Sequence, residues 1–184
     1  MKTTTVPGGR LGELIGYVLN ADSNQVDRHE LCEVLGVYPP NMPILVNYNL
    51  PFEEMIARGH YSFRDEDIKK VNLSVSKSGK CKLVTNLFHF GDHISISEIR
   101  STLRKKGCWM TNVVELLAFR AQYPDFHRSR PIIAPMSVIK MDCASYVPAL
   151  ESEDVDGELH HNLSLSWSDV GFRDVYVLGI KVIA

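Results

Sequence analysis

Two histidine pairs are the side chains in this sequence that most resemble a metal-binding pattern. His89 and His93 are four residues apart, so on a strand both would point to the same face. Gly91 lies between them and predicts a turn that breaks this geometry. His160 and His161 are adjacent and would point to opposite faces of a strand. A structural or transition-metal site needs further ligands beside either pair, so we predict no bound metal.

An acidic stretch near the C-terminus offers a second kind of chemistry. Glu151–Glu158 is rich in carboxylates, whose oxygens suit calcium, but it lacks the ordered spacing of an EF-hand loop. We therefore interpret it as a solvated acidic loop. These residues leave open an alternative function, a metal-dependent small-molecule enzyme that uses His89, His93 and this loop.

Motifs typical of other catalytic sites do not occur in the sequence. Gly8-Gly9 follows no predicted strand and precedes no Lys-Ser or Lys-Thr pair, which argues against a phosphate-binding P-loop. There is no Gly-x-Ser-x-Gly elbow, and no spacing of serine, histidine and aspartate singles out a catalytic triad. We predict a protein that is not an enzyme, with no catalytic residues and no cofactor.

The C-terminal stretch has the pattern of a β scaffold that carries a loop. Apolar residues alternate with serines, which is typical of a half-buried strand. The loop Asp169–Val175 follows, and then a second strand, Tyr176–Ile183. Binding residues concentrate on such loops, although the pattern also fits an ordinary C-terminal hairpin with a solvated serine face. The alternating residues are Leu163, Ser164, Leu165, Ser166, Trp167 and Ser168.

The overall composition is that of an ordinary globular protein. Its 184 residues are 45% hydrophobic and 23% charged, with a formal net charge of −2. The longest basic run, Arg104-Lys105-Lys106, is too short for a nucleic-acid patch, so we expect no nucleic-acid partner. No run of about 18 apolar residues occurs, so we expect no membrane insertion.

The cysteines and the N-terminus give two weaker indications. No Cys-x-x-Cys pair occurs, and buried free thiols are the expected state of the four cysteines. Met1–Pro7 has no apolar segment of the kind that a signal peptide carries. This predicts a cytoplasmic protein, or one displayed at the surface by another route. The cysteines are Cys32, Cys81, Cys108 and Cys143.

Local patterns place helices and short strands along the chain. Ser95 and Glu98 form a capping box that opens a helix to Lys106, and Thr111 is expected to cap the next helix, which continues to Ala121. We predict an α+β fold, with a helical extension and a domain whose antiparallel sheet is small, irregular and near the C-terminus. The extension covers residues 1–43 and the domain 44–184. Further helices are expected at 10–20, 27–35 and 51–59, and strands at 44–48, 71–76, 81–90, 131–135 and 145–150, of which 71–76 and 81–90 form a hairpin.

Several segments, taken in order, resemble a known protein family. The resemblance covers about two-thirds of the chain, from Pro51 onward. Together the segments are similar to the variable (target) proteins of diversity-generating retroelements, most of all to the archaeal branch. The residues that carry the resemblance are Phe52–Tyr61, Val114–Phe119, Tyr123-Pro124, Pro131–Ala134, Ser137-Val138, Tyr146–Leu150, and Leu163, Leu165 and Trp167.

The resemblance implies a C-type-lectin-like fold and a binding surface that adenine-directed, reverse-transcriptase-based mutagenesis rewrites within residues 140–180. The protein would then be a ligand-binding display protein for a protein or another macromolecular ligand. Phe172, Arg173 and Tyr176 are expected to supply most of the affinity. The expected scaffold residues are Leu163, Leu165, Trp167, Leu178 and Ile180. The expected ligand-binding residues are Ser145, His161, Ser164, Ser166, Ser168, Asp169, Val170, Phe172, Arg173, Asp174, Val175 and Tyr176.

The amino-acid composition allows one test of this expectation. Rewriting the adenines of Asn-type codons cannot produce Lys, Glu, Gln, Met or Trp, which supply 31 of the 184 residues. Among the 22 residues Leu159–Ile180, only Trp167 belongs to this set, a deficit of the sign that diversification predicts. A third interpretation, an accessory structural protein with one fixed partner, stays open. The sequence indicates neither the ligand nor the oligomeric state.

Overall fold

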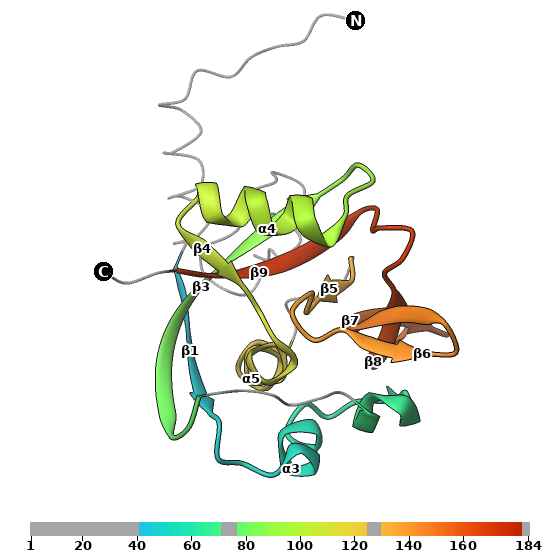
Figure 1. The fold of residues 1–184 in the computed structure, drawn as a ribbon. Coiled ribbons are helices and arrows are strands. Elements are labelled where there is room, and N and C mark those ends of the chain that lie inside the picture. Colours follow the sequence, from blue (N-terminus) through green and yellow to red (C-terminus); the bar gives the residue numbers. More distant parts are fainter. Residues whose placement is uncertain (1–40, 71–76, 125–129, 182–184) are drawn as a thin grey trace, which may run out of the picture. The chain divides into compact units, whose positions relative to one another are not determined.

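The computed structural model describes residues 41–70, 77–124 and 130–181, which all belong to one compact unit, Pro40–Ala184. The helices expected at 10–20 and 27–35 and the strand expected at 71–76 lie outside the described residues. The described unit is a mixed α+β structure dominated by strands, as Figure 1 shows. Its elements are β1 (Met42–Asn47), α3 (Phe52–Ala57), β2 (Phe63–Arg64), the 3₁₀ helix η1 (Glu66–Lys70), β3 (Lys80–Phe90), α4 (Ile96–Lys105), β4 (Cys108–Met110), α5 (Val113–Gln122), β5 (Ile132–Ile133), β6 (Ile139–Met141), β7 (Ala144–Val155), β8 (Glu158–Trp167) and β9 (Val175–Lys181).

The strands form one nine-stranded sheet in the order β1-β3-β9-β5-β7-β8-β2, with β4 on β9 and β6 on β7. All pairs are antiparallel except β2 with β8 and β5 with β9. The predicted class and the mostly antiparallel pairing are confirmed. The expectation of a small sheet confined to the C-terminal part is wrong, because β1 and β3 from the first half pair with each other and β3 pairs with β9. The expected C-terminal hairpin is also wrong, because β5 and β7 lie between β8 and β9.

Helices α4 and α5 both pack buried apolar side chains against the sheet. On α4, Ile99 and Leu103 are fully buried in a cluster with Ile133 of β5 and Val177 of β9. Helix α5 packs against β1 and β7, and Phe119 is fully buried. Figure 1 shows α5 end-on between these strands. Strand β9 therefore lies at the centre of the sheet and has no solvated face over most of its length.

The start of each long helix is fixed by a capping box. Ser95 and Glu98 cap α4 as predicted, with Ser95 N donating to Glu98 Oε2 at 2.9 Å. Thr111 was expected to cap α5, but Asn112 does so, together with Glu115. The Thr111 hydroxyl instead donates to the carbonyl of Leu178 at 3.1 Å. The Thr111 hydroxyl is therefore engaged in a long-range hydrogen bond, which the spacing of nearby residues does not reveal.

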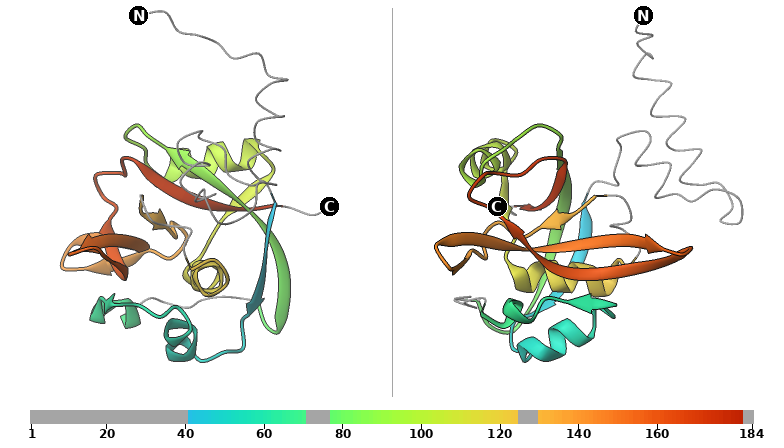
Figure 2. Two further views of the ribbon diagram at one scale, coloured as in Figure 1. Left: turned by 180° about the vertical axis from the view of Figure 1, so that it is seen from behind. Right: turned by 90° about the vertical axis from the view of Figure 1, so that its right-hand side faces the viewer.

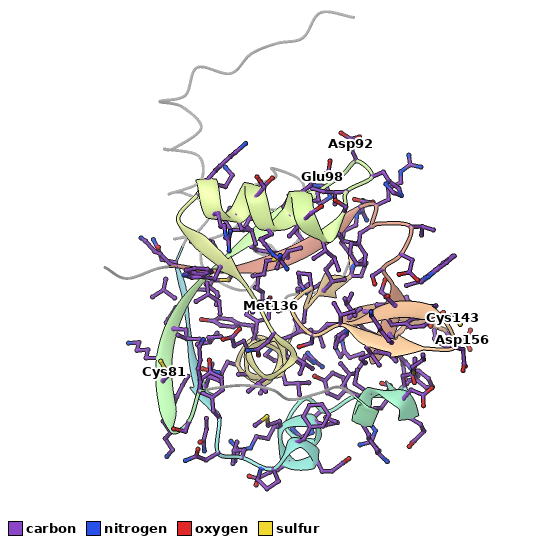
Figure 3. The ribbon with its side chains drawn as sticks, in the orientation of Figure 1. Cys81, Asp92, Glu98, Met136, Cys143 and Asp156 are labelled. Carbon is purple, nitrogen blue, oxygen red and sulfur yellow. The ribbon has the colours of Figure 1, made fainter. Side chains whose placement is uncertain are left out.

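The acidic stretch expected to be a loop is part of a long hairpin. Strand β7 continues to Val155 and β8 begins at Glu158, so only Asp156 and Gly157 turn the chain. Both have positive φ, 54° and 85°, as tight hairpin turns require. Figure 2 (right) shows β7 and β8 as an extended ribbon, and Figure 3 labels Asp156 at its turn. Residues 153–159 are all exposed, so the solvent exposure inferred from the acidic composition is confirmed, although the backbone is paired.

Three of the four cysteines fall within the described residues, and these three are free. Cys108 is buried, as expected. Cys143 is exposed, contrary to the expectation, because it lies in the tight β6–β7 turn with φ 68° (Figure 3). Cys81 on β3 is partly buried.

Side chains from the end of α5 close the outer edge of β1. The Gln122 side chain accepts a hydrogen bond from Leu45 N at 2.9 Å and donates to Leu45 O at 3.2 Å. Tyr123 Oη donates to the Pro43 carbonyl at 2.8 Å. The amide of Gln122 thus reproduces the pair of bonds that a neighbouring strand would make.

The buried carboxylate of Glu115 links α5 to two other segments of the chain. These are Tyr48, which follows β1, and Lys77, which precedes β3. The Glu115 side chain is 2% exposed, and its Oε1 accepts hydrogen bonds from Tyr48 Oη at 2.8 Å and from Lys77 Nζ at 2.9 Å. Its Oε2 accepts from Asn112 N at 2.9 Å. Burial, and then the neighbouring Glu115 carboxylate, raise the pKa of Tyr48 well above its ordinary value. A buried carboxylate with three donors around it is satisfied rather than reactive.

A second tyrosine makes stability sensitive to alkaline pH. Burial raises the pKa of Tyr61 far above its ordinary value, although the Arg120 cation opposes this. Above pH 10 the unfolded chain therefore ionises Tyr61 while the folded chain does not. We expect the free energy of unfolding to be unaffected by this group below about pH 10 and to fall by about 1.4 kcal/mol per pH unit above it. Urea unfolding measured between pH 8 and about 11.5 tests this.

Tyr61→Phe is the matched control for this prediction. Within the described residues the Tyr61 hydroxyl is buried and has no hydrogen-bond partner, so its removal should be neutral or stabilising at pH 7. The variant should also lack the alkaline slope that Tyr61 contributes. An unchanged slope in the variant would assign the alkaline loss to other groups.

Candidate functional site

The three apolar residues expected to form one scaffold stripe have different surroundings. Leu163 is fully buried, and its carbonyl accepts from Asp65 N at 2.9 Å where η1 begins. Leu165 is partly buried. Trp167 is 52% exposed, so its expected place in the core is wrong. It is the last residue of β8, where the strand extends beyond the core. Leu178 and Ile180 of β9 are buried, as expected.

The serines expected to face outward lie on an inner face of the hairpin. Ser164 is opposite Ala149 and Ser166 is opposite Val147, and directly opposite residues share a face of the sheet. Ala149 and Val147 are fully buried in the cluster beneath α4. Ser164 Oγ is itself buried and has no hydrogen-bond partner among the described residues. Ser164 and Ser166 are partly buried, so their expected exposure is wrong: Leu163 on the other face is buried as well, which means that both faces of β8 are covered here.

Three further residues expected on the binding surface are also in the core. Phe172 is 3% exposed, Val175 4% and Tyr176 7%. Phe172 forms a bridge with Ile94, with both N–H···O bonds at 2.8 Å, and its ring joins the cluster beneath α4. Val175 and Tyr176 already belong to β9. Their expected exposure is wrong because the loop returns to the core earlier than the sequence indicated.

One end of the loop 168–174 is fixed by an aspartate. Asp169 Oδ2 accepts hydrogen bonds from Ser145 N at 2.8 Å and from Trp167 Nε1 at 3.1 Å. Ser168 N donates to the Ser145 carbonyl at 2.8 Å, which joins the loop to the start of β7. The bond from the Ser145 backbone, and then that from Trp167, hold the pKa of Asp169 below its usual value. Asp169 therefore holds the loop and orients the Trp167 ring.

A second aspartate fixes the other end of the same loop. Asp174 has φ 55°, and its Oδ1 lies 2.7 Å from His89 Nε2 while its Oδ2 lies 2.7 Å from Arg130 Nε. The hydrogen bond from His89, followed by that from Arg130, lowers the pKa of Asp174. The His89 ring also lies against Tyr176, with centroids 4.9 Å apart. His89 is thus part of the loop's support.

Between these two ends a few side chains remain exposed. Gly171 has φ 80°, and a Cβ there would lie 2.9 Å from the Ile94 carbonyl oxygen, so the loop approaches the β3–α4 connection closely. Val170 is 52% exposed, and Arg173 is exposed. Beside them lie Trp167, which is 52% exposed, and the partly buried Ser145 and Ser168. We call the set Ser145, Trp167, Ser168, Val170 and Arg173 the loop surface.

The structure changes which residues of this region could bind a ligand. Trp167, which the sequence assigned to the scaffold, belongs to the loop surface. Its position at the end of a strand, directly before Ser168-Asp169, is the sequence feature that could have indicated this. His161 is not near the loop: it pairs with Ser152, its Nδ1 lying 3.1 Å from Ser152 Oγ. Ser152 is seven residues along β7 from Ser145, about 23 Å of extended strand.

The residues of the metal-dependent alternative are not brought together. His89 contacts Asp174, while His93 is exposed beside Gly171. Across residues 41–70, 77–124 and 130–181, no three His, Cys, Asp or Glu side chains are grouped so as to hold a metal ion. This alternative therefore has no ligand set in the described part of the chain.

Comparisons with known proteins do not assign the chain to a family. No family model, curated protein or solved structure matches this sequence or fold.

In the described part of the chain, no helix is long and apolar enough to span a membrane.

Proposed function

We propose that this protein is a ligand-binding display protein, and that the loop surface contacts a protein or another macromolecular ligand. The observation that carries the proposal is a loop fixed at three points from which the Val170 and Arg173 side chains are exposed, beside the exposed Trp167. Asp169, the Phe172–Ile94 bridge and Asp174 hold its backbone. A surface that is already ordered loses little conformational entropy on binding, which favours affinity.

The exposed residues are of the types that dominate binding energetics. Trp and Arg are enriched among residues whose truncation costs most affinity, and Trp167 and Arg173 are both exposed. The Asp169 carboxylate holds the indole N–H of Trp167, so its ring is presented in one orientation. Ser168 and Val170 supply smaller adjacent contacts.

The resemblance to retroelement variable proteins extends this proposal to a C-type-lectin-like fold and a diversified surface. A scaffold tolerates such diversification when buried and exposed positions are cleanly separated, as Phe172 and Val170 are. Trp167 cannot arise by adenine rewriting of Asn-type codons, so it would be a constant anchor beside variable neighbours. Asp169 and Asp174 would be restricted, because each supports the loop.

The gene locus provides the test of diversification. We expect a near-copy of the codons for residues 140–180 near a reverse transcriptase gene, differing mainly at adenines. Differences should fall at the codons of Ser168, Val170 and Arg173, and those of Phe172 and Val177, which are buried, serve as the internal control. A locus without such a repeat would contradict diversification and favour a surface with one fixed partner.

A further inference from the structure

A groove separate from the loop surface has the composition of a docking site. It lies between α4, β4 and the β5–β6 turn and has a volume of about 280 Å³. Trp109, Met136 and Val138 line it and are 52%, 55% and 41% exposed. Trp109 lies on β4, whereas Met136 and Val138 lie between β5 and β6. The fold therefore brings two separate segments of the chain together to form this apolar surface. None of the groove's lining residues belongs to the loop surface.

The backbone beneath the exposed side chains is fixed. Met136 N donates to the Thr111 carbonyl at 3.2 Å, and Ser137 N donates to the Ala134 carbonyl at 3.1 Å. Ser137 Oγ accepts from Val113 N, the first residue of α5, at 2.8 Å. Figure 3 labels Met136 beside the segment that leads from β4 to α5. The exposure of Met136 is therefore imposed by an ordered turn, and binding there would not require the turn to become ordered.

The charge of the groove has one sign. Arg100 and Arg104 of α4 line it, and none of its lining residues is acidic. The Arg104 guanidinium carbon lies 5.6 Å from the centroid of the Trp109 ring, so an aromatic face and a cation are presented together. Among the described residues, neither arginine forms an ion pair with a carboxylate. Two unpaired guanidinium groups beside an apolar floor are complementary to carboxylates beside apolar side chains.

The geometry points to a second binding function: this groove docks an acidic, apolar peptide segment of a partner protein. Its volume of about 280 Å³ is enough for a few side chains of a peptide. Apolar anchors such as Leu or Trp would contact Met136 and Val138, while Glu or Asp would bind Arg100 and Arg104. Trp, Met and Arg are the residue types enriched in protein interfaces.

Peptide binding to the full chain tests this inference. The probe is a fluorescein-labelled library of peptides about twelve residues long, composed of Glu, Leu and Trp in varied order, with matched libraries in which Gln or Lys replaces Glu. Binding is measured by fluorescence anisotropy. We expect acidic peptides to bind, Gln peptides to bind more weakly and Lys peptides not to bind, with affinity falling as salt rises.

Charge reversals on one helix provide the matched control. Arg104→Glu should weaken acidic-peptide binding by about tenfold or more, because it places a carboxylate against the ligand's own. Lys105→Glu changes the same charge at an exposed residue of α4 outside the groove and should change affinity less than about twofold. Met136→Ser should also weaken binding without altering the circular dichroism spectrum.

Four outcomes would overturn the inference. The first is equal binding of acidic and Gln peptides, and the second is an equal effect of Arg104→Glu and Lys105→Glu. The third is the absence of any peptide with a Kd below about 1 mM. If Met136→Ser instead converts a dimer into a monomer in light scattering, a second copy of this chain occupies the groove and the peptide assignment is wrong. None of these results depends on diversification of the loop surface.

Discussion

Glu115→Ala is expected to lower the free energy of unfolding by about 3 kcal/mol. The carboxylate is 2% exposed and accepts hydrogen bonds from Tyr48, Lys77 and Asn112. Alanine would leave the Asn112 N–H and the Tyr48 hydroxyl without their acceptor and would remove three charge-assisted bonds. Lys77 is 52% exposed, so its ammonium can regain water, which keeps the loss below that of a fully buried pair. Urea unfolding at pH 7 measures the difference.

Glu98→Ala is the matched control for this substitution. Glu98 occupies the same capping-box position in α4 that Glu115 occupies in α5, but it is exposed. Its removal should cost about 1 kcal/mol or less. The difference between the two variants isolates the buried network from helix capping. Equal losses would show that the bonds to Tyr48 and Lys77 contribute nothing to stability.

Leu163→Ala is expected to cost about 2–5 kcal/mol, and Trp167→Ala less than about 1 kcal/mol. Both residues lie on β8 and both were assigned to the scaffold from the alternation of the sequence. Leu163 is fully buried, so its truncation leaves a cavity, whereas Trp167 is 52% exposed and leaves none. The larger side chain therefore has the smaller effect. On ligand binding the order should reverse, because Trp167 belongs to the loop surface.

The comparison is made from urea midpoints and m-values of both variants. Leu165→Ala, at a partly buried position of the same strand, should fall between them. If Trp167→Ala destabilises the protein as much as Leu163→Ala, Trp167 is a core residue in solution and cannot anchor a ligand.

Local chemistry in the sequence was sufficient to predict helices α3, α4 and α5, which lie within the described residues. Ser95 and Glu98 identified α4 because both bonds of a capping box are made within four residues. The same spacing relates Asn112 to Glu115, so the information needed for α5 was present. Thr111 was assigned as the cap because threonine is a favoured residue at that position, and its hydrogen bond to Leu178, 67 residues away, cannot be read from local sequence.

The sheet and the site depend on pairings that no local pattern encodes. Alternation correctly predicted that Leu163 is buried, but not that the serines opposite Ala149 and Val147 are covered as well. The loop between Asp169 and Asp174 was located correctly in the sequence. Its supports were not, because Ser145, His89 and Arg130 come from distant segments. Such contacts are set by the fold as a whole, so the burial of Leu163, Leu178 and Ile180 was predicted correctly, whereas that of Trp167, Phe172 and Tyr176 was not.

The way Gln122 closes the edge of β1 has a consequence for solubility. An open strand edge is a template on which another chain can add, and Leu45, 56% exposed at this edge, would favour such growth. Gln122 occupies the Leu45 amide and carbonyl, so the first step of sheet-to-sheet aggregation is obstructed there. Strand β1 and the hairpin that carries the loop surface lie toward opposite ends of the sheet. Protection against fibril-like association is thus independent of the amino acids presented by the loop, and the loop can change without exposing the chain to aggregation at β1.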